Sequence, residues 1–466
     1  MQFIRRWQLL LAFFAGASLV LSFAPFSFYP ISFLALAGFF YLLLQAPSNK
    51  AHWQITWWFS AGLFMSGVHW VFFSIHFFNH AHWLLASLIT LAFCLFIASL
   101  MLPFALITQF FRRAHRITQL LLVFPAAWVI VEGFRGWVFT GFPWLLIGQA
   151  HIDNALAHIA PVTGVFGVSW LVAIFAGSIT LFVIGTTKDR IFAASLAVVL
   201  FASSFALSFI QWTHPTGDPI KVSLLQGNIP QEKKWEPSYY QPTIDIYQQL
   251  TEQSWDSDLI IWPETAIASY FGNASEEVIE PLRVQALMEQ SSLLIGGFYY
   301  DFKQDATYNS VLSIDNKAGS EIYAKRHLVP FSEYFPFLGY LEWLREWIQL
   351  PYDSVDKGTG GNTLRILGMD VQTSICYEDV YGNEIIDGLP KAKLLVNLSN
   401  DGWFTGSIEP AQHMQIARMR ALETGRYLLR ATNNGVSGII DHKGRFIATA
   451  DQYLQTTIKG KAQPFE

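Results

Sequence analysis

Long apolar runs fill the first part of the chain, and short apolar runs separated by turns fill the rest. A membrane-spanning helix needs about 20 apolar residues to cross about 30 Å of hydrocarbon. Only a helix or a closed barrel satisfies its own backbone hydrogen bonds there. The pattern therefore predicts an α-helical transmembrane bundle of about seven helices in residues 1–213. Its runs are 8–24, 30–46, 55–75, 83–108, 118–134, 162–187 and 191–212.

After a linker at residues 214–219, the pattern becomes that of strands and turns. Lys221–Gln226 alternates between polar and apolar residues, and the buried run Leu259–Trp262 stops at Pro263, which cannot donate to a sheet. Mixed strands and helices over about 250 residues predict one α/β domain, residues 214–466, with a substantial core. Further strands are expected at 293–297, 309–314, 371–375, 394–398 and 438–441, and helices at 276–290 and 411–426.

Charge divides the chain at the same place. Residues 1–213 hold 9 of the 30 Lys and Arg residues and 3 of the 35 Asp and Glu residues, so this part carries +6. The remainder carries −11, which together gives the net charge of −5. Soluble domains have about 25% charged residues, and the 14% found here averages two different regions. A single soluble domain and a disordered chain are both excluded, and the acidic second part argues against nucleic-acid binding.

The basic residues of the first part predict which way it faces. Lys and Arg in short loops stay on the cytoplasmic side of a membrane. With the N-terminus in the cytoplasm, eight of the nine lie on that side and only Arg135 lies on the other. Seven spans then place residues 214–466 outside the cytoplasm. The eight are Arg5, Arg6, Lys50, Arg112, Arg113, Arg116, Lys188 and Arg190.

Three chemically active side chains lie in the second part, two of them directly after a predicted strand. These are Glu264, Lys325 and Cys376. Singly, each has an ordinary structural explanation, since a lone Cys is usually a small buried hydrophobe. Together they fit nucleophilic catalysis. A thiol with a pKa near ~8.5 needs a base, a partly desolvated carboxylate supplies one, and an ammonium group stabilises the resulting oxyanion.

Cysteine use limits the alternatives. Cys94 lies inside an apolar run and Cys376 lies in the polar part, so a disulfide between them is not expected. CxxC and Cys/His spacings typical of metal sites are absent from the sequence. We expect neither a metal nor a cofactor.

Longer strings around these residues resemble a known family. The Glu–Lys–Cys order is similar to that of the nitrilase (carbon–nitrogen hydrolase) superfamily, and the membrane part narrows the resemblance to the apolipoprotein N-acyltransferases. The likeness covers nearly the whole chain. The strings that carry it are Gln226–Gln231 with Lys234-Trp235, Trp262–Thr265, His327–Tyr334, Ile375–Glu378, Asn400–Phe404 and Arg418–Arg426.

The resemblance implies a fold and a role for each matching residue. The fold would be an α/β nitrilase-like αββα sandwich. Glu264 would be the general base, Lys325 the oxyanion-stabilising cation and Cys376 the nucleophile. Supporting groups would be the carboxylates of Glu333 and Glu378 and the main-chain N–H of Tyr377. Substrate-binding candidates are Trp144, Trp235, Tyr334 and Trp403.

The resemblance also implies substrates and a location. An acyl chain from a phospholipid would pass through a Cys thioester to the N-terminal amine of diacylglyceryl-cysteine in a lipoprotein. The enzyme would be a monomer of the bacterial cytoplasmic (inner) membrane, with its catalytic domain on the periplasmic side and no nucleic-acid partner. The family usually has one more span after this domain, and no such apolar run follows Lys459 in this sequence.

Residues 334–350 have one apolar and one charged helical face. We interpret them as a lipid-contacting lid, with a helix packed on the domain core as the alternative.

Two other functions remain open at this point. A membrane-tethered amidase or nitrilase would hydrolyse a C–N bond with the same Glu264, Lys325 and Cys376, and would differ only in using water as the second acceptor. A transporter or receptor is disfavoured. Ionisable residues deep inside spans normally mark ion pathways, and such residues are scarce here, with Glu132 near the end of its span as the main case.

Overall fold

The computed structural model describes residues 2–78, 80–315, 319–334 and 355–466. Beyond Tyr334, the segment interpreted above as a lid therefore lies outside the described residues. The chain forms two compact units. The first unit contains residues 1–72, 81–212 and 411–415, and the second contains residues 73–80, 213–410 and 416–466.

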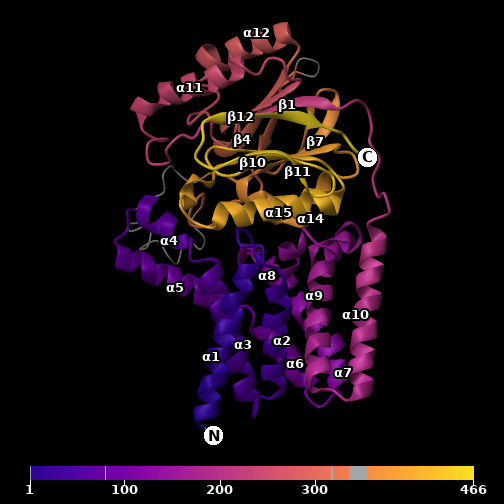
Figure 1. Ribbon diagram of the computed structural model, residues 1–466. Helices are drawn as coiled ribbons and strands as arrows, with labels where there is room; N and C mark the ends of the chain where they lie inside the picture. Colours follow the sequence, from indigo (N-terminus) through magenta and orange to yellow (C-terminus); the bar gives the residue numbers. More distant parts are fainter. Residues whose placement is uncertain (1, 79, 316–318, 335–354) are drawn as a thin grey trace. The chain divides into compact units, whose positions relative to one another are not determined.

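The first unit is helical (Figure 1), and each of the seven predicted apolar runs coincides with helix. Four helical segments are long and apolar enough to cross a membrane, or five if one bent pair is a single span. Two shorter apolar helices, Arg6–Ser22 and Pro30–Leu44, fall below that length, so the number of seven spans stays a prediction. The α-helices of the described residues before 213 are α1 (Gln2–Leu19), α2 (Pro30–Leu44), α3 (Asn49–Gly67), α4 (Val71–Phe73), α5 (Trp83–Ser99), α6 (Leu102–Phe110), α7 (Arg116–Thr118), α8 (Phe124–Arg135), α9 (Ala160–Ile184) and α10 (Thr187–Leu207).

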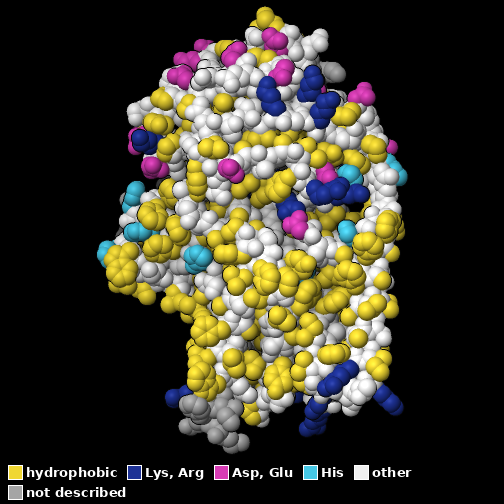
Figure 2. All heavy atoms as spheres, viewed as in Figure 1, with side chains coloured by type: hydrophobic (Ala, Val, Ile, Leu, Met, Phe, Trp, Pro, Cys, Tyr) yellow, Lys and Arg dark blue, Asp and Glu magenta, His cyan; other side chains and the backbone are white. Residues whose placement is uncertain are grey.

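Basic side chains gather at one end of this helical unit, whose visible side is mostly hydrophobic (Figure 2). Arg112, in the loop after α6, donates a hydrogen bond of 2.9 Å to Asn49 Oδ1 at the start of α3. His115 of the same loop lies within electrostatic reach of Asp189, at the start of α10. Three of the basic loops thus share one end of the unit, which is the arrangement that a single cytoplasmic side requires.

The second unit is built on two six-stranded sheets. Its strands are β1 (Ile220–Gln226), β2 (Leu259–Ile261), β3 (Ser292–Asp301), β4 (Ala306–Ile314), β5 (Ile322–Ala324), β6 (Thr363–Ile366), β7 (Met369–Ile375), β8 (Leu394–Ser399), β9 (Leu428–Thr432), β10 (Ser437–Ile440), β11 (Phe446–Ala450) and β12 (Thr456–Ala462). The first sheet has the order β12-β1-β2-β3-β4-β5 and the second β11-β10-β9-β8-β7-β6. In both, three central parallel strands are flanked by antiparallel ones.

Side chains that alternate along the strands divide the interior into layers. Leu224 points into a core shared with residues of the second sheet such as Val396. Its neighbour Leu225 points the other way, into a core shared with α11 (Pro237–Glu252) and α12 (Glu280–Glu289). On the second sheet, α15 (Glu409–Thr424) lies beside β11, where Arg418 stacks on the ring of Phe446. The predicted αββα sandwich is confirmed.

The core between the sheets offers a stability test. Leu294 is fully buried in it, whereas Leu287 on α12 is 61% exposed. Truncating a buried Leu leaves a cavity and costs about 2–5 kcal/mol. We expect Leu294→Ala to lower the thermal unfolding temperature measured by calorimetry in detergent, by roughly 2–4 °C per kcal/mol, and Leu287→Ala to leave it nearly unchanged. Equal effects of the two substitutions would contradict this description of the core.

Candidate active site

Cys376 stands directly after β7, at the first residue of a short 3₁₀ helix that ends at Val380. Its φ of 51° lies in the left-handed region, which residues with a side chain rarely adopt. Its carbonyl oxygen accepts a hydrogen bond of 3.1 Å from Asn397 Nδ2 on β8. Backbone strain of this kind persists only where the surroundings over-determine it, and it concentrates at functional sites.

A buried ion network holds Asn397 in place. Arg430 on β9 donates to Asn397 Oδ1, and it also donates to Asp379 at 3.0 Å and to Asp401 at 3.1 Å. Burial by itself would lower the pKa of Arg430, but the two aspartates outweigh it and raise that pKa. The arginine therefore stays charged and fixes the turn that carries Cys376.

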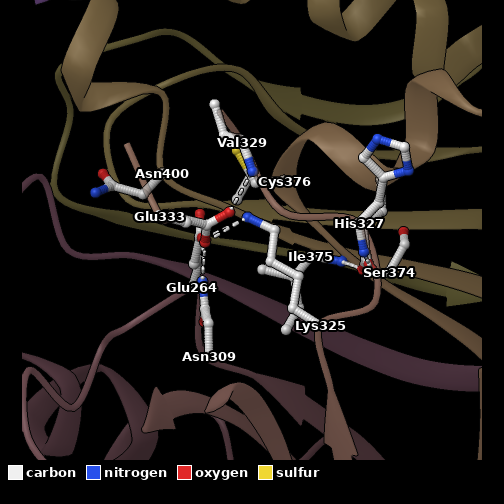
Figure 3. A network of polar contacts seen from close by, with 12 residues as sticks. Glu264, Asn309, Lys325, His327, Val329, Glu333, Ser374, Ile375, Cys376 and Asn400 are labelled. Atoms are coloured by element: carbon white, nitrogen blue, oxygen red, sulfur yellow. Dashed lines mark hydrogen bonds and ion pairs between the residues drawn. The ribbon is translucent and has the colours of Figure 1, made fainter. Parts of the chain in front are cut away.

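A second cluster surrounds Lys325 (Figure 3). Its Nζ lies 2.8 Å from Glu333 Oε1 and 3.5 Å from Glu264 Oε1. Asn309 Nδ2 donates to the same two oxygen atoms, at 2.8 Å to Glu264 and 3.0 Å to Glu333. The residues come from the end of β2, from β4 and from the segment after β5. All four are at least nine-tenths buried.

Charge in this cluster sets the state of Lys325. Burial alone would lower its pKa, but the carboxylates of Glu333 and Glu264 outweigh burial and hold the pKa of Lys325 well above its usual range. Cys376 acts on the pKa of Lys325 in the same direction as the two carboxylates. Lys325 is therefore a permanent cation, suited to stabilising negative charge on a reacting oxygen.

Glu378 connects the lysine loop to the cysteine turn. Its carboxylate accepts hydrogen bonds from the Tyr323 hydroxyl at 2.8 and 2.9 Å and from the main-chain N–H groups of Arg326, His327 and Ile375 at 2.6–3.0 Å. Burial raises the pKa of Glu378, although the charge of Lys325 and these hydrogen bonds oppose that effect. One side chain thereby links the segments that carry Lys325 and Cys376.

The aromatic candidates separate into three places. Trp235 and Tyr334 pack against one apolar cluster, formed by Phe298, Leu328 and Val355. Trp144 is fully buried in the helical unit, and the Trp403 ring meets Phe78 edge-on at 5.7 Å. Tyr377 contacts Tyr381 and His327 through its ring. A substrate-binding role for the four candidates, and an oxyanion role for the Tyr377 N–H, stay predictions.

Sequence reasoning missed two residues of the Lys325 cluster and its surroundings. Asn309 is the fourth residue of β4, in the stretch of that strand that is buried throughout, and an amide among buried residues was the available signal. Lys234 was quoted only as part of a family-like string, yet its Nζ donates to the main-chain oxygen of Glu264 at 3.1 Å. The sequence around Asn309 and Lys234 does not indicate their hydrogen-bond partners, because those partners lie on other strands or loops.

Comparison with known proteins shows the family of both parts of the chain. Residues 15–178 match the family described as the apolipoprotein N-acyltransferase N-terminal domain, and residues 221–464 match the carbon-nitrogen hydrolase family. Apolipoprotein N-acyltransferase of Methylococcus capsulatus is 42% identical over 98% of this chain and 90% of that protein. The enzyme of Coxiella burnetii is 36% identical over 97% of this chain and 93% of that protein.

The chain belongs to the apolipoprotein N-acyltransferase family. In this N-acyltransferase, the stretch that matches the carbon–nitrogen hydrolase family, residues 221–464, contains the cluster described above. Among solved structures, Saccharomyces cerevisiae Nit3, a member of branch 10 of the nitrilase superfamily, is 17% identical. The match covers 53% of this chain and 91% of that chain, with a TM-score of 0.41.

The amide that joins the two carboxylates gives a test of the cluster. Asn309→Asp places a third carboxylate beside Glu264 and Glu333, in place of a donor to both. Like charges at this range strongly disfavour ionisation, so we expect acyltransferase activity at pH 7 to fall about 100-fold, as in loss of other electrostatic contacts of active sites. The activity is measured as transfer of a labelled acyl chain to a lipopeptide, and the loss follows because a proton retained among the three carboxyl groups makes Glu264 a poorer base.

The matched control for Asn309→Asp is Asn273→Asp, at an exposed asparagine whose side chain donates a hydrogen bond to Ser269 Oγ. It introduces the same charge outside the cluster and should leave activity within about twofold, as surface changes usually do. Near-normal activity of folded Asn309→Asp at pH 7 would show that the amide does not support the cluster.

Proposed function

We propose that this protein transfers an acyl chain from a phospholipid, through a thioester on Cys376, to the N-terminal amine of diacylglyceryl-cysteine in a lipoprotein. The observation that carries the proposal is a strained nucleophile turn set beside a buried, permanently charged lysine and a carboxylate with an amide-oriented oxygen. Those are the nucleophile, cation and base that covalent acyl transfer requires. No cofactor is needed for it.

The first half-reaction forms the acyl-enzyme. Glu264 accepts the thiol proton of Cys376, and the sulfur attacks the ester carbonyl of the phospholipid. Negative charge then develops on the carbonyl oxygen, next to Lys325 and the main-chain N–H of Tyr377 at the start of the 3₁₀ helix. The C–O bond breaks, and Glu264 returns the proton to the leaving oxygen. The products are a thioester and a lysophospholipid.

The second half-reaction passes the acyl chain to the lipoprotein. The free α-amine of diacylglyceryl-cysteine attacks the thioester carbonyl, and Glu264 accepts a proton from the attacking nitrogen. The C–S bond breaks and the proton returns to the sulfur, so Cys376 is restored and an amide is released. Two separate half-reactions through one covalent intermediate predict ping-pong kinetics.

Two features support lipid substrates. The apolar cluster with Trp235 and Tyr334 adjoins the loop that carries Lys325 and Glu333, and aromatic side chains there offer a wall for an acyl chain. The helical unit places its basic loops at one end, which fits a multi-pass protein of the bacterial inner membrane with its catalytic unit on the periplasmic side. We propose that it acts there as a monomer.

An acyl-enzyme test addresses the first half-reaction. Purified protein in detergent is incubated with phospholipid that carries one labelled acyl chain, without an acceptor. We expect a hydroxylamine-sensitive adduct, about one per protein molecule in the single-nucleophile scheme, that is absent in Cys376→Ala. Cys94→Ala is the matched control and should keep the adduct. A wild-type protein that matures lipoproteins without ever forming the adduct would overturn the thioester mechanism.

The acceptor distinguishes this function from hydrolysis. Adding a diacylated lipopeptide with a free N-terminal amine should move the label onto the peptide within one turnover. The same peptide with an acetylated amine should leave the adduct in place. Rapid loss of the label to water in both cases would instead identify a hydrolase that uses the same three residues.

A further inference from the structure

Lys234 is a buried cation that the mechanism above does not use. It lies in the loop after β1, is only 2% exposed, and donates to the main-chain oxygen of Glu264 at 3.1 Å. Its neighbour Lys233 is exposed. An ammonium group that is taken out of water is costly unless nearby charges compensate it, so the place of Lys234 beside the general base needs a reason.

The loop that carries Lys234 is held firmly. Asn433 donates to the Ile229 carbonyl at 2.8 Å and accepts from the Ile229 N–H at 2.9 Å through its amide. Asn400 donates to Gln231 Oε1 at 2.8 Å. The Lys234 N–H closes the turn by donating to the Pro230 carbonyl at 3.0 Å. Lys234 is therefore presented to the site by a fixed loop.

The charges of the Lys325 cluster balance only when Lys234 is counted. Glu264 and Glu333 carry two negative charges, and Lys325 supplies one positive charge. Lys234 supplies the second. Transfer of the thiol proton to Glu264 moves one negative charge to sulfur and leaves this balance unchanged. Glu378, whose carboxylate is bound by the Tyr323 hydroxyl and three main-chain N–H groups, has its own set of donors.

We propose that Lys234 is a second cation of this active site, a positioning residue that holds the main chain of Glu264 and stabilises negative charge at Cys376. The charged or titratable groups that act on it are Glu264 and Cys376. Lys325 and Glu333 belong to the same cluster through Glu264. The two lysines divide the work: Lys325 contacts the carboxylates, and Lys234 contacts the backbone of the base.

The protonation of Lys234 gives this role a pH dependence. Burial lowers its pKa to about 8, although the charges of Glu264 and Cys376 act in the opposite direction. Below that pH the ammonium supports the thiolate, and as the pH rises through about 8 the support is lost. Lys325, with its pKa held well above the usual range, keeps its charge throughout.

The test compares Lys234→Met, Lys234→Arg and the matched exposed control Lys233→Met. Alkylation of Cys376 by iodoacetamide is followed against pH by mass spectrometry. Removing a cation that acts on Cys376 should raise the pH midpoint of alkylation by roughly one to two units in Lys234→Met. Lys233→Met should react like wild type. An unchanged midpoint in folded Lys234→Met would overturn the proposal.

Formation of the acyl adduct supplies the second measurement, and this arm rests on the proposed function. Without an acceptor, its single-turnover rate should fall at least about tenfold in Lys234→Met at pH 7. Loss of the favourable charge should raise the pKa of the Cys376 thiol by about one unit or more, and each unit reduces the thiolate fraction about tenfold. Wild type should decline between pH 7 and 9. Lys234→Arg should decline less, because arginine stays charged.

The outcomes separate the two proposals. A shifted alkylation midpoint without any acyl adduct in wild type would reject the phospholipid donor and retain the role of Lys234. An adduct that forms equally fast in wild type and folded Lys234→Met would reject only the role of Lys234. If Lys234→Met does not fold, the wild-type rate profile decides, and a rate that stays flat from pH 7 to 9 would overturn the proposal.

Discussion

The ion cluster around Lys325 is the interaction on which the catalytic unit depends. One ammonium group contacts two carboxylates in a region closed to water, and an amide orients both carboxylates. Removing any partner would leave a buried charge uncompensated, which costs several kcal/mol. The members come from the end of β2, from β4 and from the segment after β5. The cluster therefore forms only when β2, β4 and β5 have been brought together in the first sheet.

The proposed nucleophile comes from the other sheet. Cys376 follows β7, and its left-handed backbone is fixed by Asn397 on β8 and by Arg430 on β9. The apolar core joins the two sheets from whose ends Glu264, Lys325 and Cys376 extend. Glu378 hydrogen-bonds to the segments that carry Lys325 and Cys376. Hydrophobic packing thus supplies the proximity, and buried polar networks supply the orientation that chemistry needs.

Much of the fold could be read from local pattern. The strands predicted around 221, 259, 293, 309, 371, 394 and 438 and the helices around 276 and 411 all form. The strands that were missed have physical reasons. β5 and β11 are edge strands with partly exposed residues, so they show no buried apolar run. β9 is buried throughout, yet Arg430 interrupts its apolar pattern. The sequence does not show that this arginine is buried, because the aspartates that neutralise it are distant along the chain.

Sequence by itself determined the division into an apolar basic part and an acidic domain, the alternation that builds the sandwich, and the choice of Glu264, Lys325 and Cys376 as candidate residues. Those features are local, since amino-acid composition, hydrophobic periodicity and short motifs can each be recognised from neighbouring residues. Only the tertiary structure decided which groups accompany them. Asn309 bridges two carboxylates, and Lys234 meets the backbone of Glu264. Such roles depend on distances between segments, and burial then makes each of those contacts strong.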